Sequence, residues 1–137
     1  MASYVKYYCS TEDLAEGVHN LGSDTFKLAL TNTAPTLTHT LLSQIGEISA
    51  GAGYSAGGAT VTVTSSSQSS GLYIAIATDA TVTASGGDVG PFRYAVLHNE
   101  TAVKLLGYWD IGSETTITDG NTWTADFDPT NGVIQVT

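Results

Sequence analysis

The sequence predicts an all-β domain, an antiparallel β-sandwich with a jelly-roll-like arrangement of strands. From Asp24 to Thr137, short runs of alternating apolar and polar residues are separated by Gly, Asn, Asp or Ser, which is typical of small antiparallel β domains. About nine such runs occur, as expected of a sandwich or jelly roll. A length of 137 residues and a hydrophobic fraction of 42% predict one domain, residues 1–137, that can bury a core without disulfides or metals.

The N-terminal segment, residues 1–22, is expected to carry the one short helix. Ser10 followed at the third position by Asp13 resembles a capping box, and acidic residues just after Ser10 suit the first turn of a helix. We therefore predict a helix that begins after Ser10 and ends at Gly17 or Asn20. Ahead of it, the run from Tyr4 to Tyr8 forms a brief aromatic and β-branched patch.

The clearest strand is Asp24–Thr31, in which apolar residues occupy every second position from Phe26 to Leu30. Pro35 ends the extended region, because proline cannot donate to a strand ladder. The leucines and isoleucines of Thr36–Ile48 are spaced as on a helical turn rather than a strand. Residues 49–58 hold too much glycine for regular structure and are expected to form an exposed loop or extension.

The strands resume after the glycine-rich loop and continue to the end of the sequence. Each run is rich in β-branched or aromatic residues, and turn-forming residues flank it. The hydroxyl-rich stretches Ser65–Ser70 and Ser85–Asp88 are predicted to be connections. The predicted strands are residues 59–64, 72–77, 80–84, 92–98, 105–111, 115–118, 122–127 and 133–136.

The charge balance argues against two classes of partner. Four basic and 13 acidic residues give a formal charge of -9, which repels phosphate backbones and anionic lipids. We therefore expect no nucleic acid and no membrane surface as a partner. The start of the chain lacks a basic region followed by an apolar one, which predicts a protein made and used in a cytoplasm. Cys9 is the only cysteine, so no intrachain disulfide is expected.

Two stretches resemble ligand-binding loops only in part. Gly51–Gly58 lacks the Lys before Ser or Thr of a phosphate-binding loop and does not lie between a strand and a long helix. The stretch from Asp126 to Gly132 carries oxygen-bearing side chains, but it misses the register of a calcium loop by one residue, and Pro129 interrupts it. We expect a turn that leads into the last strand, with calcium at Asp126 and Asp128 as the alternative.

The sequence predicts neither a catalytic centre nor a cofactor. His19, His39 and His98 are widely spaced, and none forms a metal-binding pair with another histidine or with Cys9. No Gly-x-Ser-x-Gly motif or other recognised nucleophile context is present. We therefore expect a protein that is not an enzyme, although a triad assembled from distant positions would leave no local motif.

Aromatic residues offer the best candidates for partner contact. Those in strands could form a sugar-binding or subunit-binding surface, but strand aromatics more often pack in cores. Tyr54 is flanked by glycines and is therefore expected to be exposed, as an anchor into a neighbouring chain. The candidate contact residues are Tyr4, Tyr7, Tyr8, Tyr54 and Arg93.

Four stretches, which together span much of the chain, resemble small structural proteins of tailed bacteriophages, and most of all head decoration (cement) proteins. They are Asp13–Pro35, Gly86–Asn99, Leu106–Asp110 and Phe127–Ile134. These motifs are structural and carry no chemistry.

The resemblance implies a jelly-roll-like virion protein on the capsid surface, made in the host cytoplasm, that stabilises contacts between major capsid subunits. Its implied partners are the major capsid protein and further copies of itself, as a homo-oligomer or as neighbours on the shell. The alternative is a tail or fibre module that binds a host receptor. A hydrolytic enzyme would instead need a deep pocket with converging Ser, His and Asp.

Overall fold

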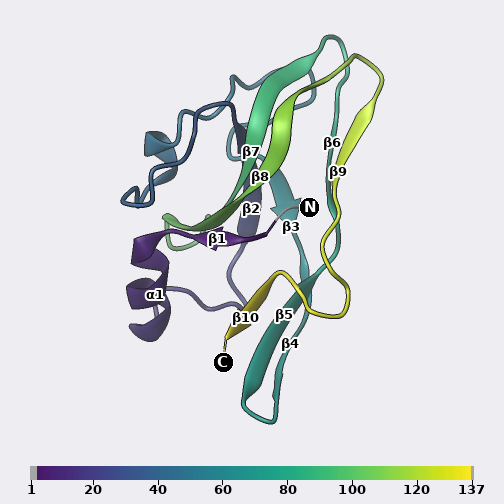
Figure 1. The fold of residues 1–137 in the computed structure, drawn as a ribbon. Helices are drawn as coiled ribbons and strands as arrows, with labels where there is room; N and C mark the ends of the chain where they lie inside the picture. The colour runs from purple at the N-terminus through teal and green to yellow at the C-terminus, as the bar shows by residue number, and fades with distance from the viewer. Residues whose placement is uncertain (1–2, 137) are drawn as a thin grey trace.

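The computed structural model describes residues 3–136 and consists mostly of antiparallel sheets with one short α-helix (Figure 1). This confirms the all-β class that the sequence predicts, with a sandwich-like packing of sheets. The jelly-roll-like arrangement stays a prediction. Within the described residues no helix has the length and apolar character needed to cross a membrane.

A five-stranded antiparallel sheet, in the order β1-β8-β7-β2-β3, forms the centre of the molecule. Strand β2, between β7 and β3, is buried on both faces, because Leu28 and Leu30 face the main core while Ala29 faces a second, smaller apolar cluster. The strands are β1 (Val5–Lys6), β2 (Phe26–Thr31), β3 (Ala59–Val61), β7 (Val89–Asn99) and β8 (Lys104–Ile117).

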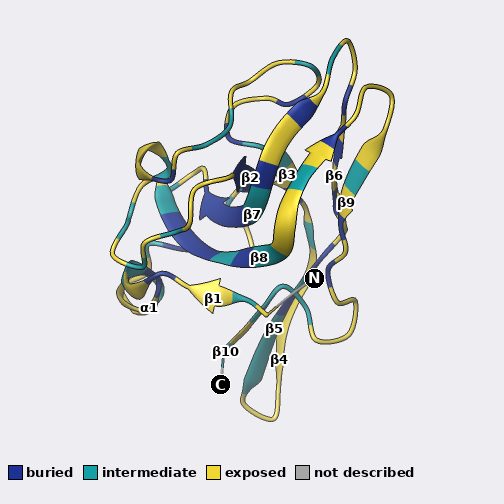
Figure 2. Ribbon diagram, turned by 45° about the horizontal axis from the view of Figure 1, so that its top comes forward, coloured by how far each residue is buried: buried dark blue, intermediate teal, exposed yellow. Residues whose placement is uncertain are grey.

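Two smaller sheets pack against this one. The order of the first is β10-β5-β4, and the second pairs β6 with β9. Buried side chains from all three sheets meet in one core, whose largest members include Phe92, Trp109 and Phe127. Figure 2 shows which parts of the strands are buried. The strands are β4 (Val63–Ser69), β5 (Leu72–Ala77), β6 (Ala80–Thr83), β9 (Thr122–Ala125) and β10 (Ile134–Val136).

The prediction that Ser65–Ser70 is a connection is wrong for all but its last residue. The serines up to Ser69 belong to β4 and pair with β5 through a tight hairpin. Its two turn residues, Ser70 and Gly71, have φ angles of 51° and 84°, as a type I′ turn requires. A strand at the edge of a sheet needs few buried side chains, so its composition resembles that of a loop.

Helix α1 (Tyr8–Ala15) begins earlier than the sequence predicts. Its N-cap is Tyr7, no side chain caps it, and Ser10 and Asp13 lie inside the helix as buried residues. The capping-box prediction is therefore wrong. The start is set by tertiary contacts, because the Tyr7 N–H donates to the Leu106 carbonyl and the Tyr8 N–H to the Leu37 carbonyl. The end of the helix agrees with the prediction, since Gly17 has a φ of 78° just past the C-cap.

Two further segments differ from expectation. Within Thr36–Ile48 only the 3₁₀ turn η1 (Leu42–Gln44) is helical, and only Ile45 of the apolar residues becomes buried. The two strands predicted between residues 105 and 118 form one long strand, β8. The sequence pattern indicated a break between two strands around Gly112. In the structure the strand continues through this region, and register shifts between β8 and β7 accommodate the extra residues.

Candidate binding surfaces

Tyr54 is not an exposed anchor, and that prediction is wrong. Its side chain is 3% exposed and belongs to the main core. The hydroxyl donates to the Glu47 carboxylate at 2.5 Å and accepts the Leu30 N–H at 3.0 Å. Burial, aided by the neighbouring Glu47 carboxylate, raises the pKa of Tyr54 well above its usual value. As placed here, Tyr54 holds the glycine-rich loop to strand β2 and does not reach a neighbouring chain.

The rest of the glycine-rich loop is also held in place. The Gly57 N–H donates to the Glu47 carboxylate at 2.7 Å, and the His98 Nε2 donates to the Gly57 carbonyl at 2.7 Å. A two-residue bridge between Gly51 and Tyr54 closes the loop's tip. The loop is therefore fastened to β2 and β7. Of the two alternatives that the sequence offers, the extension is wrong, whereas most residues of the loop are exposed as expected.

His98 gives this fastening a pH dependence. Burial lowers the pKa of its imidazole below the ordinary 6.5, although the Gly57 carbonyl, Glu47 and Glu100 act in the opposite direction. Between the two pKa values the unfolded chain binds more protons than the folded chain, so stability falls as the pH drops. Burial likewise lowers the pKa of His19, which adds to the same loss.

We expect the melting temperature to be constant above about pH 7 and to fall as the pH drops from about 6.5 toward the lowered pKa of His98. The His98→Gln variant, which keeps a side-chain donor, should show a smaller fall. Carboxylates with lowered pKa values stay ionised over this range and do not contribute; they are Asp24, Asp110 and Asp128. Thermal melts of the wild type and His98→Gln at a series of pH values provide the measurement. An identical fall in both proteins would show that His98 does not cause the pH dependence.

The three N-terminal tyrosines have different environments. Tyr4 is half-buried and packs on Trp109, with ring centroids 5.1 Å apart. Tyr7 is 0% exposed and packs on Tyr108 in the second apolar cluster, so its prediction as a contact residue is wrong. Burial raises the pKa of both Tyr4 and Tyr7. Tyr8 is 64% exposed and is the most exposed of the three.

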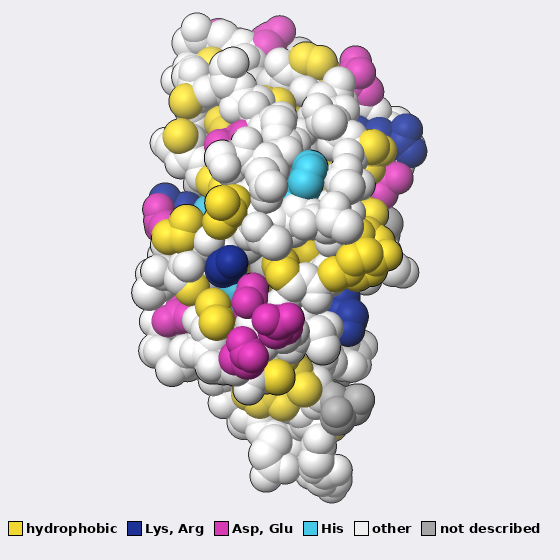
Figure 3. All heavy atoms as spheres, turned by 90° about the vertical axis from the view of Figure 1, so that its left-hand side faces the viewer, with side chains coloured by type: hydrophobic (Ala, Val, Ile, Leu, Met, Phe, Trp, Pro, Cys, Tyr) yellow, Lys and Arg dark blue, Asp and Glu magenta, His cyan; other side chains and the backbone are white. Residues whose placement is uncertain are grey.

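Tyr8 shares its side of the molecule with two other exposed apolar residues, Leu41 and Val103. The loop that carries Leu41 lies between the starts of α1 and β8, because the Tyr8 N–H donates to the Leu37 carbonyl and the Leu105 N–H to the Thr40 carbonyl. We call Tyr8, Leu41 and Val103 the apolar face. Figure 3 views this side and shows hydrophobic side chains there, interrupted by charged ones. Sequence reasoning missed Leu41 and Val103, since neither residue type in a loop signals exposure.

Arg93 remains at the surface, as a contact residue must. Its guanidinium forms a bidentate pair with Asp110, with an Nε to Oδ1 distance of 3.0 Å and an Nη2 to Oδ2 distance of 3.2 Å. The hydrogen bonds and charge of Arg93, together with the Gly112 N–H, hold the pKa of Asp110 below its usual value. A partner would therefore meet a neutralised pair rather than a free cation.

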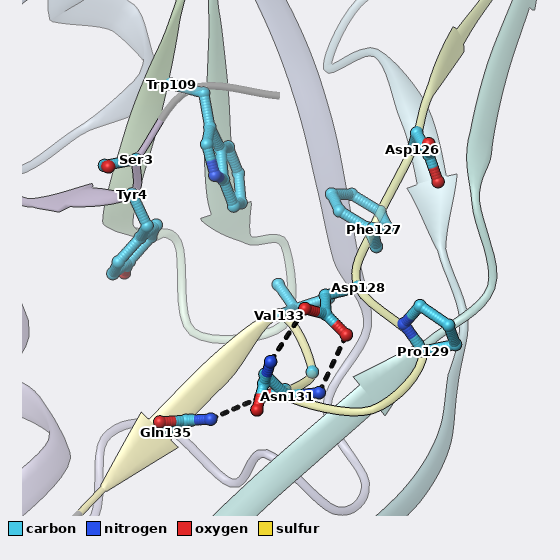
Figure 4. A pocket seen from close by; sticks show the side chains of 11 residues that line it. Ser3, Tyr4, Trp109, Asp126, Phe127, Asp128, Pro129, Asn131, Val133 and Gln135 are labelled. Atoms are coloured by element: carbon cyan, nitrogen blue, oxygen red, sulfur yellow. Dashed lines mark hydrogen bonds between the residues drawn. The ribbon is translucent and has the colours of Figure 1, made fainter.

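The turn from Asp126 to Gly132 lines a cavity of about 780 Å³ (Figure 4). Tyr4, Trp109 and Phe127 provide aromatic surface, and Asn131 and Gln135 provide amides. Trp109 and Phe127 are each 5% exposed, so a ligand would meet their edges rather than open faces. The combination of aromatic and amide groups suits a small polar ligand such as a sugar.

Asp128 is used within this turn. Its carboxylate accepts the N–H groups of Thr130 and Asn131 and the Asn131 side-chain amide, at 2.7 to 2.9 Å. These bonds lower its pKa. The arrangement is the turn that the sequence predicts ahead of the last strand. Among residues 3–136 no group of three or more His, Cys, Asp or Glu side chains is placed to hold a metal ion.

A buried polar cluster near the end of β7 escaped sequence reasoning altogether. The Asn99 side-chain amide donates to the His19 Nδ1 at 3.0 Å and to the Asp24 carboxylate at 2.7 Å. Asn99 is fully buried, and its side-chain oxygen Oδ1 accepts the Ala102 N–H. The cluster ties the connection between α1 and β2 to the turn after β7. Within the described part of the chain, no serine, threonine or cysteine side chain hydrogen-bonds a histidine ring.

Comparisons with protein-family models, curated proteins and solved structures find no match for this chain.

Proposed function

We propose that this protein is a structural virion protein that binds the outer surface of a phage capsid and stabilises contacts between major capsid subunits. The phage-like stretches support this role, and so does the absence of a nucleophile motif in the sequence. Its partners are the major capsid protein and neighbouring copies on the shell. It is made in the host cytoplasm and needs no cofactor for this role.

The observation that carries the proposal is the conformation of Val103. This β-branched residue has a φ of 58°, a left-handed conformation that such side chains rarely adopt. It is also 62% exposed at the connection between β7 and β8. Strain of this kind costs about 1–3 kcal/mol and clusters at functional sites. Neither the strained backbone nor the exposed side chain of Val103 stabilises the isolated fold. A partner surface that buries this side chain would explain both, because the strained backbone presents the side chain to the partner.

Tyr8 and Leu41 extend this contact. Exposed aromatic side chains are the usual anchors of protein interfaces, because they bury a large area at a small cost in conformational entropy. One copy with a few such anchors binds modestly. Many copies on a shell sum these contacts, which raises the stability of the assembled capsid.

Purified protein is expected to sediment with expanded capsids, and the double variant Tyr8→Ser with Val103→Asn should bind at least about tenfold more weakly. Asparagine tolerates the left-handed conformation, so Val103→Asn alone should raise the free energy of unfolding by about 1 kcal/mol. Binding and stability thus change in opposite directions. Thr124→Ala, on the exposed side of β9, is the control and should bind normally. Failure of the wild type to sediment with capsids would overturn the proposal.

A second candidate is a tail or fibre module that binds a host receptor, which the cavity beside Trp109 favours. Its aromatic and amide lining suits a sugar. A glycan array with the purified protein discriminates between the two functions. Glycan binding that Gln135→Ala reduces, without capsid binding, would favour the receptor role.

A further inference from the structure

Strand β4 is a free sheet edge. It lies at the outside of the sheet β10-β5-β4, and its hairpin with β5 extends away from the body of the molecule (Figure 1). Every residue from Thr64 to Ser70 is exposed (Figure 2). The edge strand at the opposite side of this sheet, β10, has only three residues.

The hairpin geometry shows which backbone groups point outward. A two-residue type I′ turn is closed by a hydrogen-bonded pair, here Ser69 and Leu72. Hydrogen-bonded and non-bonded pairs alternate along an antiparallel ladder, so Ser65 and Ser67 bond to β5. The N–H and C=O groups of Ser66 and Gln68 therefore face away from the sheet, where no strand of residues 3–136 pairs with them.

This edge carries no charge and no proline, and its one irregularity, a register shift between Val63 and Ser65, lies ahead of the outward-facing Ser66 and Gln68. Natural proteins shield free edges with charged side chains, proline or very short strands. From Ile48 to Thr78 the sequence contains no charged residue and no proline. Because the chain as a whole carries a charge of -9, two copies repel each other over most of their surfaces and least at this hairpin.

We propose that two copies of this chain associate by antiparallel pairing of β4 with β4 of the second copy. A two-fold axis through the strand brings the outward groups of Ser66 and Gln68 opposite those of the other copy, with donors facing acceptors. The two three-stranded sheets then form one continuous sheet. The apolar face lies outside β4, so this pairing does not depend on the proposed capsid role.

The first test is the oligomeric state measured by sedimentation equilibrium over a range of concentrations. The wild type should dimerise, and Ser65→Lys with Ser67→Lys should raise the dissociation constant at least about tenfold, because like charges then face each other across the pair. Neither serine side chain makes a hydrogen bond within the described residues, so both changes should leave the monomer folded. Thr38→Lys with Thr130→Lys adds the same charge at exposed loop positions and should not weaken the dimer.

Amide hydrogen exchange locates the interface. The Ser66 and Gln68 amides should exchange quickly in dilute protein and become protected as the concentration rises. A chain that stays monomeric at millimolar concentration would overturn the proposal, as would a dimer that the β4 lysines do not weaken. Protection of these amides only when another protein is added would assign the edge to a different partner, and it would also overturn self-pairing.

Discussion

Replacing Tyr54 by phenylalanine is expected to lower the free energy of unfolding by about 2–4 kcal/mol. The change removes one hydroxyl that makes two hydrogen bonds: it donates to the half-buried Glu47 carboxylate and accepts the buried Leu30 N–H. The Leu30 N–H would then lie buried without a partner, and an unsatisfied buried group costs more than the hydrogen bond itself contributes. The half-buried Glu47 carboxylate would lose one of its two hydrogen bonds and keep the one from the Gly57 N–H. Urea unfolding of wild type and variant provides the measurement.

Tyr73→Phe is the matched control for this experiment. Tyr73 lies half-buried in β5, and its hydroxyl makes no hydrogen bond within residues 3–136. Its removal should change the free energy of unfolding by less than about 0.5 kcal/mol. Equal effects of the two substitutions would show that the hydroxyl of Tyr54 does not fasten the loop.

Gly58→Ala is expected to destabilise the fold by about 3 kcal/mol or more, because the added methyl group overpacks the site and the backbone conformation there disfavours a side chain. A Cβ at this position would overlap the backbone carbonyl of Leu28, and the φ of 88° disfavours any side chain. Leu28 pairs with Ala59 where β2 meets β3, so the backbone cannot move aside without breaking that ladder. We expect a large fall in melting temperature.

Gly86→Ala separates the two causes. Gly86 has a similar φ of 80°, but a Cβ there would meet nothing within 4 Å. Only the cost of the left-handed backbone remains, about 1 kcal/mol. If both alanine variants melted at the same temperature, the close approach of Gly58 to β2 would not contribute to the loss of stability in Gly58→Ala.

Both substitutions test a structural role for the glycine-rich loop, which differs from the role that its composition indicated. The composition of residues 49–58 indicated an exposed loop or extension, with Tyr54 as an anchor into a neighbouring chain. In the structure Gly58 lets the backbone approach β2 closely, and Tyr54 turns inward to bond Leu30. The loop therefore stabilises the fold, and the partner contact is proposed for the apolar face instead.

The fold class and most strands were predictable because they depend on local patterns. Alternation placed Phe26, Leu28 and Leu30 on one face, and all three lie in the main core. The predictions for the helix start and for β4 were wrong, since these elements depend on distant partners. The N–H of Tyr7 bonds Leu106, and the serines of β4 pair with β5.

The candidate contact residues were predicted less well than the fold. Of the tyrosines, Tyr8 is exposed, whereas Tyr7 and Tyr54 are buried. Aromatic residues suit a core and an interface equally, so residue type alone does not separate the two. Val103 carried no signal at all, because its exposure and its φ of 58° arise from the connection between β7 and β8.

The sequence by itself determined the class of fold, the acidic charge and the region from Ile48 to Thr78 that carries no charge. Only the tertiary structure decided that this region includes a free edge at β4, that Tyr54 fastens a loop, and that Val103 stands exposed. The physical reason is the distance along the chain over which the interactions act. Alternation and turn residues act between near neighbours in the chain, whereas burial and pairing depend on which distant segments meet.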